Sequence, residues 1–258
     1  MFDKKKIILN HIRSFNKKNK RAIDFFEAIS NILIEKTFDE NKDYKNINIL
    51  ELASRNDILR KKILYRFLKS IYFQTCISEE IKVKNNNKVV SNLNDIVFQQ
   101  KTFDYCFSLF YLNSVENVPL IFKNIYNILK VNGTFVSVVP SDECFKEFRS
   151  FFTEFLRPKK NYNFNPLFDI QTLGNLCSAS GFKNVVVDKE TFQFNLSKPE
   201  DLWRFIRHVG ESNYLLNRKD FIIKKSIFKE FYNIYSEKLK KGILTQNTLS
   251  IFFLIGKK

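Results

Sequence analysis

INILELASRND, residues Ile47 to Asp57, is the stretch that decides the fold of this chain. Its first half is apolar and β-branched and ends in an acid, which predicts a buried strand of a parallel sheet. Its second half is polar and leads into a segment, Ile58 to Leu68, that we expect to be helical. A strand, a tight turn and a helix in this order form the nucleotide-binding corner of a doubly wound sheet.

The turn of this corner lacks glycines. A glycine-rich turn lets the backbone approach the ligand while the N–H groups of the helix face it. The three places where glycines are expected hold Ala53, Arg55 and Asp57. The corner is therefore predicted to be present with altered ligand-binding chemistry. Arg55 could fill the vacated space or point into solvent, and we favour solvent, because the third residue of such a turn is often exposed.

Length and composition indicate a globular protein. The chain has 258 residues, enough for one α/β domain with additions or for two small domains. Its 44% hydrophobic content argues against a disordered chain. A net charge of +16 raises nucleic acid or an anionic membrane as candidate partners. However, the basic residues are scattered, and the abundant Lys, Asn, Ile and Phe share A/T-rich codons, so a surface set by composition is favoured over a nucleic-acid site.

The sequence argues against a metal-binding, a membrane-spanning and a secreted protein. The four cysteines, Cys76, Cys106, Cys144 and Cys177, are far apart and there are two histidines, so no metal site is predicted. The cysteine usage fits a reducing compartment. No apolar run is long enough to cross a bilayer, and the opening MFDKKK lacks the apolar core of a secretory signal.

Strand and helix patterns alternate along the rest of the chain, which indicates a parallel sheet with right-handed crossovers. We expect the strand Ile47–Ala53 to lie in mid-sheet, between Phe103–Asn113 and the strand that contains Cys76. The other strands are predicted at Lys69–Ser78, Val89–Asn92, Thr134–Val139, Asn184–Phe194 and Ser250–Ile255. Helices are predicted at Asp3–Arg13, Ala22–Phe38, Ile58–Leu68, Val115–Lys130, Glu143–Leu156, Gln171–Ser180, Ser197–Val209 and Asp220–Lys241, and Glu79-Glu80 could open another.

Nearly the whole chain resembles the class I S-adenosylmethionine-dependent methyltransferases. The similarity to the core of that superfamily lies in three segments: Phe103-Asp104, the apolar strand that these residues open, and the later run ILKVNGTFVSVV. Two of its families are compared: the biotin-pathway O-methyltransferase that acts on a malonyl thioester, and the respiratory complex I assembly factor with its alphaproteobacterial relatives. The second is the better match. This chain resembles that family in four segments: FDKKKIILNHIRS at Phe2–Ser14, DIQTLGNLCSASGF at Asp169–Phe182, VGESNYLLNR at Val209–Arg218 and the ending ILTQNTLSIFFLIGKK.

The resemblance implies an α/β, Rossmann-like fold: a seven-stranded, mostly parallel sheet with the last strand antiparallel and helices on both faces. It implies one methyltransferase-like domain over 1–258, with an N-terminal helical segment (1–46), a nucleotide-binding-type core (47–140) and a C-terminal half (141–258) that carries a helical lid at about 197–241. The chain begins where the folded region of the family begins. We therefore expect no mitochondrial transit peptide and a bacterial cytoplasmic location.

The resemblance also implies S-adenosylmethionine as cofactor, at the carboxyl ends of the strands. Glu51 retains the acid of the first strand and either binds the amino end of the cofactor through water or caps the turn. Cys76 replaces the acid that holds the ribose, and Asn92 the acid on the adenine side. Two polar anchors are thus lost with the glycines, and we expect millimolar or undetectable binding. The candidate cofactor-binding residues are Glu51, Ala53, Ser54, Cys76, Asn92, Leu93 and Ser108.

The stretch Gly210 to Asn213 carries the family's signature. We expect Glu211, Asn213 and Arg218 to bind a protein partner, a respiratory quinone-reductase subunit, together with the loop Lys159–Asp169. An exposed Glu211 would pair with an arginine of that subunit; a structural cap after the preceding helix is the alternative.

The function predicted is a binding or assembly factor of the complex I type with a degraded cofactor site. Two alternatives stay open. One is an active methyltransferase, or an arginine hydroxylase like the eukaryotic member of the family, for which no catalytic residue is assigned. The other is a basic nucleic-acid-binding protein.

Overall fold

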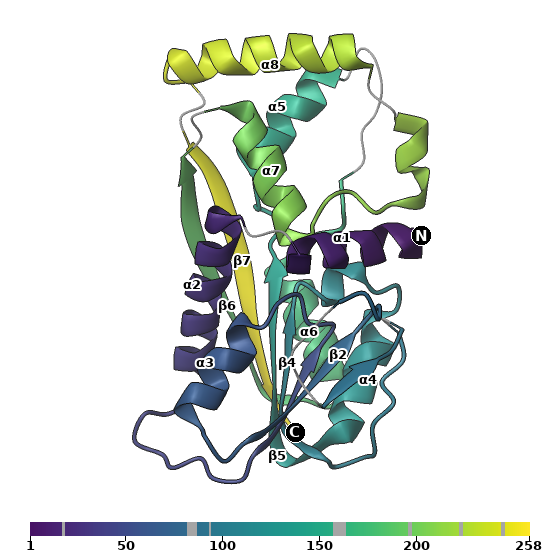
Figure 1. Cartoon of the computed structure of the whole chain (residues 1–258), viewed down its shortest axis with the longest axis vertical. Coiled ribbons are helices and arrows are strands. Elements are labelled where there is room, and N and C mark those ends of the chain that lie inside the picture. The colour runs from purple at the N-terminus through teal and green to yellow at the C-terminus, as the bar shows by residue number, and fades with distance from the viewer. Residues whose placement is uncertain are drawn as a thin grey trace.

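The computed structural model of the chain describes residues 1–16, 19–81, 87–92, 94–156, 164–195, 198–221, 224–243 and 246–258. A twisted sheet fills the lower part of the molecule, and a group of helices stands above its upper edge (Figure 1). Within the described residues the sheet has seven strands in the order β3-β2-β1-β4-β5-β7-β6. Their bounds are β1 Asn48–Leu52, β2 Ile71–Cys76, β3 Lys88–Val90, β4 Phe103–Leu109, β5 Leu129–Pro140, β6 Lys183–Asn195 and β7 Gln246–Lys257.

Strand β1 lies in mid-sheet, as its apolar run predicts. It pairs in parallel with β2 and with β4, so that Glu51 stands opposite Gln74 on one side and Phe107 on the other. Strand β7 runs antiparallel to both β5 and β6. The predicted sheet, mostly parallel with its last strand antiparallel, is confirmed.

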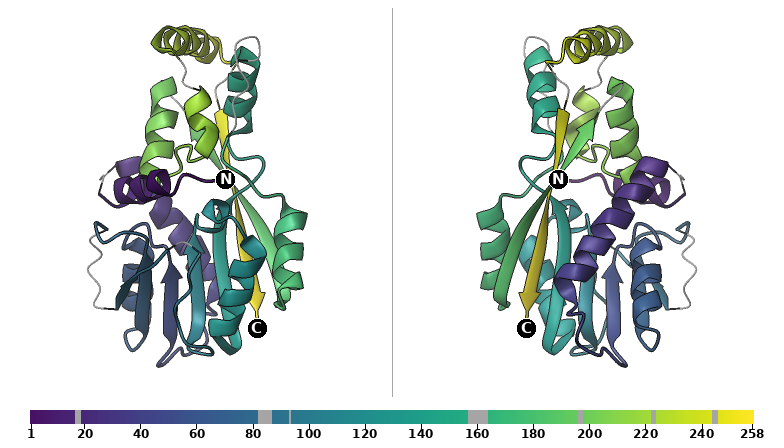
Figure 2. Two further views of the ribbon diagram at one scale, coloured as in Figure 1. Left: turned by 90° about the vertical axis from the view of Figure 1, so that its right-hand side faces the viewer. Right: turned by 90° about the vertical axis from the view of Figure 1, so that its left-hand side faces the viewer.

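Helices cover both faces of the sheet (Figure 2). Helices α2 (Lys20–Thr37) and α3 (Ile58–Arg66) lie on one face, and α4 (Val118–Ile128) and α6 (Ile170–Ala179) on the other. Successive side chains of a strand point to opposite faces. Accordingly, Ile49 joins the apolar core under α2 and α3, and Leu50 joins the core under α4 and α6.

A helical lid stands above the carboxyl edge of the parallel strands (Figure 1). It consists of α5 (Lys146–Leu156), α7 (Pro199–Val209), the 3-10 helix η2 (Leu216–Phe221) and α8 (Lys225–Lys240). Aromatic rings join these helices: the ring of Phe148 lies 5.0 Å from that of Trp203 and 6.0 Å from that of Phe231, between centroids. The segments α7, η2 and α8 fall between β6 and β7 in the chain.

Helix α1 (Lys4–Asn16) crosses the boundary between the lid and the sheet (Figure 1). Ile12 and Phe15 pack against the cluster formed by Cys76 and Ile81, beside the end of β2. The N-terminal helix therefore covers part of the edge at which doubly wound sheets meet their ligands.

Two boundaries of strands and helices were predicted wrongly. The strand expected to reach Asn113 ends at Leu109, because Phe110 turns the chain with a φ of 53° and the 3-10 helix η1 (Leu112–Ser114) follows. The helix expected to reach Lys130 ends at Ile128, and β5 begins at once.

Two more predictions fail in connecting segments. Glu79 and Glu80 lie in a turn and open no helix among the described residues. The long helix expected from Asp220 begins only at Lys225, because η2 precedes it. Ser197, the expected cap of α7, lies outside the described residues. Within those residues, every helix is too short or too polar to cross a membrane.

Candidate functional site

Glu51 sits at the end of β1 in a network of side chains from β2. Its Oε2 accepts hydrogen bonds from the Tyr72 hydroxyl and from Gln74 Nε2, both at 3.0 Å. Gln74 Nε2 also donates to the Ser54 hydroxyl at 3.0 Å. Burial raises the pKa of the Glu51 carboxyl to about 7. The carboxyl is thus held by its neighbours in the sheet, whichever of its two expected roles it serves.

The turn after β1 folds back onto β2. Ala53 has a φ of 48°, in the left-handed region that favours glycine. Its N–H donates to Thr75 Oγ1 at 2.7 Å, and the Ser54 N–H donates to the Thr75 carbonyl at 2.9 Å. The turn keeps a glycine-like backbone while carrying side chains. Its first two N–H groups are occupied by β2.

Arg55 is buried, so the expectation that it points into solvent is wrong. Its guanidinium donates to the carbonyl of Phe110 at 2.6 Å and to that of Gly210 at 2.9 Å. It also forms an ion pair with Glu211, with 2.7 Å between Nη2 and Oε1. One side chain from the β1 turn therefore ties the end of β4 to the chain that follows α7.

Gly210 lies between the Arg55 side chain and α1. It ends α7 in the left-handed conformation, with a φ of 86°. A Cβ atom added there would lie 2.5 Å from Arg55 Nη1 and 2.9 Å from the Asn10 carbonyl oxygen. The glycine lets three parts of the chain converge where a larger residue would separate them.

Polar groups of α1 are buried against this point. His11 is fully buried, and burial together with the charge of Arg55 holds its pKa well below the usual range. Neither ring nitrogen has a hydrogen-bond partner among the described residues, and the same is true of the Ser14 hydroxyl. Neutral histidine here avoids placing a second positive charge beside the guanidinium.

Glu211 is turned inward, toward Arg55 and Asn113. Its side chain is 15% exposed, and its Oε2 accepts a hydrogen bond from Asn113 Nδ2 at 2.8 Å. Burial raises the pKa of this carboxyl, against the opposing effects of Arg55 and Asn113. The Tyr214 hydroxyl donates to the Asn113 carbonyl at 2.7 Å. An arginine does pair with Glu211, but it belongs to the same chain.

The other two expected partner-binding residues also make internal contacts. Asn213 Oδ1 accepts the Leu215 N–H at 3.0 Å. Arg218 pairs with Asp3, with 2.5 Å between Nη2 and Oδ2, and donates to the Leu215 carbonyl at 2.9 Å. Thus Arg218 anchors the N-terminal segment, and its role toward a partner stays a prediction.

The remaining candidates do not gather into one site. Cys76 is buried under α1, and burial raises the pKa of its thiol to about 12. Asn92 is exposed and donates to Asp95 Oδ2 at 3.0 Å. Ser108 donates sideways to the Ser137 hydroxyl at 2.8 Å. Leu93 lies outside the described residues. Beside Asn92 the described residues line a cavity of only about 40 Å³.

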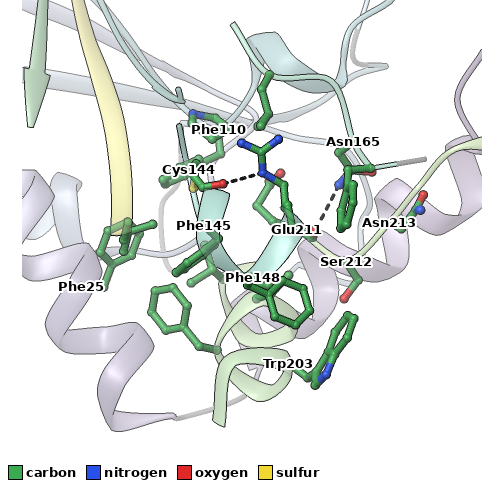
Figure 3. A pocket seen from close by; sticks show the side chains of 18 of the residues that line it. Phe25, Phe110, Cys144, Phe145, Phe148, Asn165, Trp203, Glu211, Ser212 and Asn213 are labelled. Atoms are coloured by element: carbon green, nitrogen blue, oxygen red, sulfur yellow. Dashed lines mark hydrogen bonds between the residues drawn. The ribbon is translucent and has the colours of Figure 1, made fainter. Parts of the chain in front are cut away.

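A larger cavity, about 360 Å³, lies between the lid and the ends of β4 and β5. We call it the lid pocket. Figure 3 shows the rings of Phe25, Phe145, Phe148 and Trp203 around it. Glu211 and Asn165 also line it, and the Asn165 amide donates to the Glu211 carbonyl at 3.0 Å.

Sequence reasoning missed several residues of this region. Asn113 closely follows β4, so the rule that ligands gather beyond the carboxyl ends of strands could have indicated it. Tyr214 adjoins the Gly210–Asn213 stretch and could have been included with it. Nothing in the local pattern indicated His11 or the lid pocket, because both depend on which helices meet above the sheet.

Comparisons with known proteins give a consistent result. A family model described as a methyltransferase domain matches residues 15–187. The mitochondrial arginine hydroxylase NDUFAF5 of Dictyostelium discoideum is 23% identical over 262 residues, which covers 90% of this chain and 60% of that protein. A Rickettsia prowazekii protein provisionally named a methyltransferase is 24% identical over 205 residues, which covers 76% of this chain and 91% of that protein.

Solved structures show the same fold. Phosphoethanolamine N-methyltransferase 2 of Haemonchus contortus, in complex with S-adenosyl-L-methionine, superposes with a TM-score of 0.51 at 14% identity, covering 90% of this chain and 52% of that one. The chain spans 51–60% of the length of the NDUFAF5 relatives that it matches.

Proposed function

The chain belongs to the methyltransferase-domain family, and we propose that it is a member of the complex I assembly type whose cofactor site is closed by its own side chains. On this proposal it acts by binding other molecules and does not transfer methyl groups. The observation that carries the proposal is the buried Arg55, paired with Glu211 at 2.7 Å above the turn where a cofactor would be cradled.

Three features support a closed site. Side chains stand at Ala53 and Arg55, where close backbone approach calls for glycine. The end of β2 offers the buried Cys76 in place of a carboxylate that could hold a ribose. The cavity beside Asn92 has about 40 Å³, whereas small-molecule sites measure about 300–1,000 Å³. These residues do not fit S-adenosylmethionine in the pose that a glycine turn permits.

The expected loss of affinity is large. Micromolar binding corresponds to about −8 kcal/mol. Losing a charge-assisted bond to the ribose costs roughly 1.5–3 kcal/mol, and we assign a similar loss to side chains in the turn. Together these give about 4 kcal/mol, or roughly a thousandfold. Binding is therefore expected to be millimolar or undetectable.

Calorimetry with S-adenosylmethionine and S-adenosylhomocysteine tests the proposal directly. Wild type should give no heat of binding at about 100 μM ligand, and its Tm should not move at that concentration. A ligand at about a hundred times its Kd would add about 2.7 kcal/mol of stability, which a thermal scan would detect. A Kd below about 10 μM would overturn the closed site and favour an active enzyme.

For the binding role, we propose the lid as the contact surface for a respiratory quinone-reductase subunit. Support comes from the relatives named NDUFAF5 arginine hydroxylase and from the place of the lid above the carboxyl edge of the sheet. Because Glu211 is engaged inside the chain, we assign the contact to exposed residues of α8. A bacterial cytoplasmic location remains a prediction.

Charge reversal on the lid tests this surface. Lys229 and Lys240 are exposed on α8, and Lys61 and Lys123 are also exposed, on α3 and α4. The double variant K229E/K240E should lose capture of the subunit from solubilised membranes, while K61E/K123E retains it. Equal capture by the two variants would place the contact elsewhere, and absence of capture by wild type would refute the binding role.

A further inference from the structure

We propose that the lid pocket binds a small carboxylate with an apolar body. This inference goes beyond the assembly role and does not depend on whether S-adenosylmethionine binds. The cavity of about 360 Å³ lies within the size range of small-molecule sites. Its wall is built mostly from apolar and aromatic side chains, among them Phe110, Phe145, Phe148, Trp203 and Phe205.

A positive charge stands in this apolar wall. Arg149 of α5 lines the pocket; its Nε donates to the Cys144 carbonyl at 2.8 Å, and its Nη2 donates to the Asp142 carbonyl. It makes no ion pair with any carboxylate among the described residues. Burial lowers the pKa of Arg149, against the smaller opposing effects of nearby groups that include Asp142 and Glu147. Glu147 is itself bound to the Thr248 N–H at 3.0 Å. Two carbonyls thus fix a guanidinium that keeps donors for another acceptor.

A second basic side chain adds positive potential to the pocket. Lys6 lines the pocket, and its pKa is lowered by burial and by the charges of Arg13, Arg218 and Arg207. The acid in the wall, Glu211, is already neutralised by Arg55. The pocket therefore presents net positive charge from Arg149 and Lys6 to whatever enters it.

This combination selects the ligand class. Aromatic walls favour an apolar body, and a partly desolvated guanidinium favours a carboxylate, because bonds to charged groups are the strong ones. A neutral apolar molecule would leave the guanidinium without a partner. A cation would meet Arg149 and Lys6 with like charge. A small apolar acid satisfies both the walls and the charge.

The chain carries a built-in probe of the pocket. Trp203 is the only tryptophan of the sequence, and it lines the lid pocket. Its indole N–H has no hydrogen-bond partner among the described residues. Occupation of the pocket should therefore change the fluorescence of a single, known residue.

The test is a fluorescence titration with 4-phenylbutyrate and with its neutral counterpart 4-phenylbutanol. Wild type should bind the acid about tenfold more tightly than the alcohol or better, as a charge-assisted bond provides. R149Q should reduce this preference to near unity, and R149K should restore part of it. K146Q, the same charge loss on the exposed side of α5, should leave the preference unchanged.

Three results would overturn the proposal: no saturable change with the acid at millimolar concentration, equal affinity for acid and alcohol in wild type, or equal effects of R149Q and K146Q. If R149Q does not fold, the comparison of acid with alcohol on wild type decides alone. Calorimetry with S-adenosylmethionine tests the closed cofactor site, and its result is independent of each of these outcomes.

Discussion

At the residue scale, Arg55 and Glu211 matter because they are buried together. The side chain of Arg55 is 2% exposed and that of Glu211 is 15% exposed. Such a pair does not have to stabilise the fold, since desolvation costs about as much as the attraction returns. Removing one partner is different, because the other charge is left buried and uncompensated.

We therefore expect R55M and E211Q each to destabilise the protein by about 3–5 kcal/mol in urea unfolding. The double variant should lose clearly less than the sum, with a coupling of about 0.5–3 kcal/mol. K146M, which breaks the exposed pair of Lys146 with Glu143, should cost less than about 1 kcal/mol. Strict additivity of the two single changes would contradict the pairing.

Glu51 provides a prediction about pH. Burial raises its pKa from 4.5 to about 7, so between these values the folded state binds more protons than the unfolded state. Stability must then fall as pH rises through this window, by at most about 3 kcal/mol. E51Q, which keeps an acceptor for Tyr72 and Gln74, should flatten that fall.

The measurement is urea unfolding of wild type and E51Q from pH 5 to 8, with E143Q as control. The pKa of the exposed Glu143 is lowered by its bonds to Lys189 and Lys146, so E143Q should not flatten the profile. His11 acts in the opposite sense, since its lowered pKa makes stability fall as pH drops below its unfolded value. Parallel profiles for wild type and E51Q would show that Glu51 does not titrate in this range.

At the element scale, the close of α7 controls how the lid meets the sheet. Gly210 supplies the left-handed turn and the space for Arg55 and α1. A helix that ended in any other residue would need both backbone strain and a shift of the guanidinium. The lid, α1 and the β1 turn are therefore positioned by one small residue.

G210A tests this arrangement. We expect a loss of about 1–3 kcal/mol from the positive φ, with a further loss from the contact with the Asn10 carbonyl. The matched control is G174A in α6, where an added Cβ would meet Val187 at an ordinary 3.5 Å. Because alanine favours helix, G174A should be neutral or stabilising by up to about 1 kcal/mol. A thermal scan in which both variants behave alike would remove Gly210 from this role.

At the scale of the whole molecule, the net charge of +16 is the dominant long-range feature. Much of it is spread over exposed lysines of several helices, as Lys61, Lys123, Lys229 and Lys240 illustrate. A spread charge attracts polyanions weakly and without sequence preference. It does not by itself make a nucleic-acid site.

We accordingly expect duplex DNA to bind with a Kd of about 10–100 μM at low salt, and to be released by about 200 mM salt. Fluorescence anisotropy with two unrelated duplexes measures this, and K61E/K123E and K229E/K240E should weaken it alike. Sub-micromolar affinity that survives 200 mM salt would favour the nucleic-acid alternative over the assembly role.

The fold was largely predictable because its signals are local. Local residues mark individual elements, as the apolar run at Ile47 marks β1 and the apolar stripe before Ile128 marks α4. A predicted strand boundary was wrong at Phe110, where a non-local contact accompanies the end of the strand. Phe110 adopts a φ of 53° at the end of β4, and its carbonyl accepts a hydrogen bond from Arg55. Sequence periodicity carries no record of such a contact.

The sequence alone determined the order of strands and helices, the central place of β1 and the absence of glycines from its turn. These follow from side-chain polarity and backbone preference within a few residues. The tertiary structure decided that Arg55 is buried, that Glu211 pairs with it, and that α1 covers the edge of the sheet. Those outcomes depend on which charges and apolar faces meet after folding, because the environment of a buried ionisable group is built from distant parts of the chain.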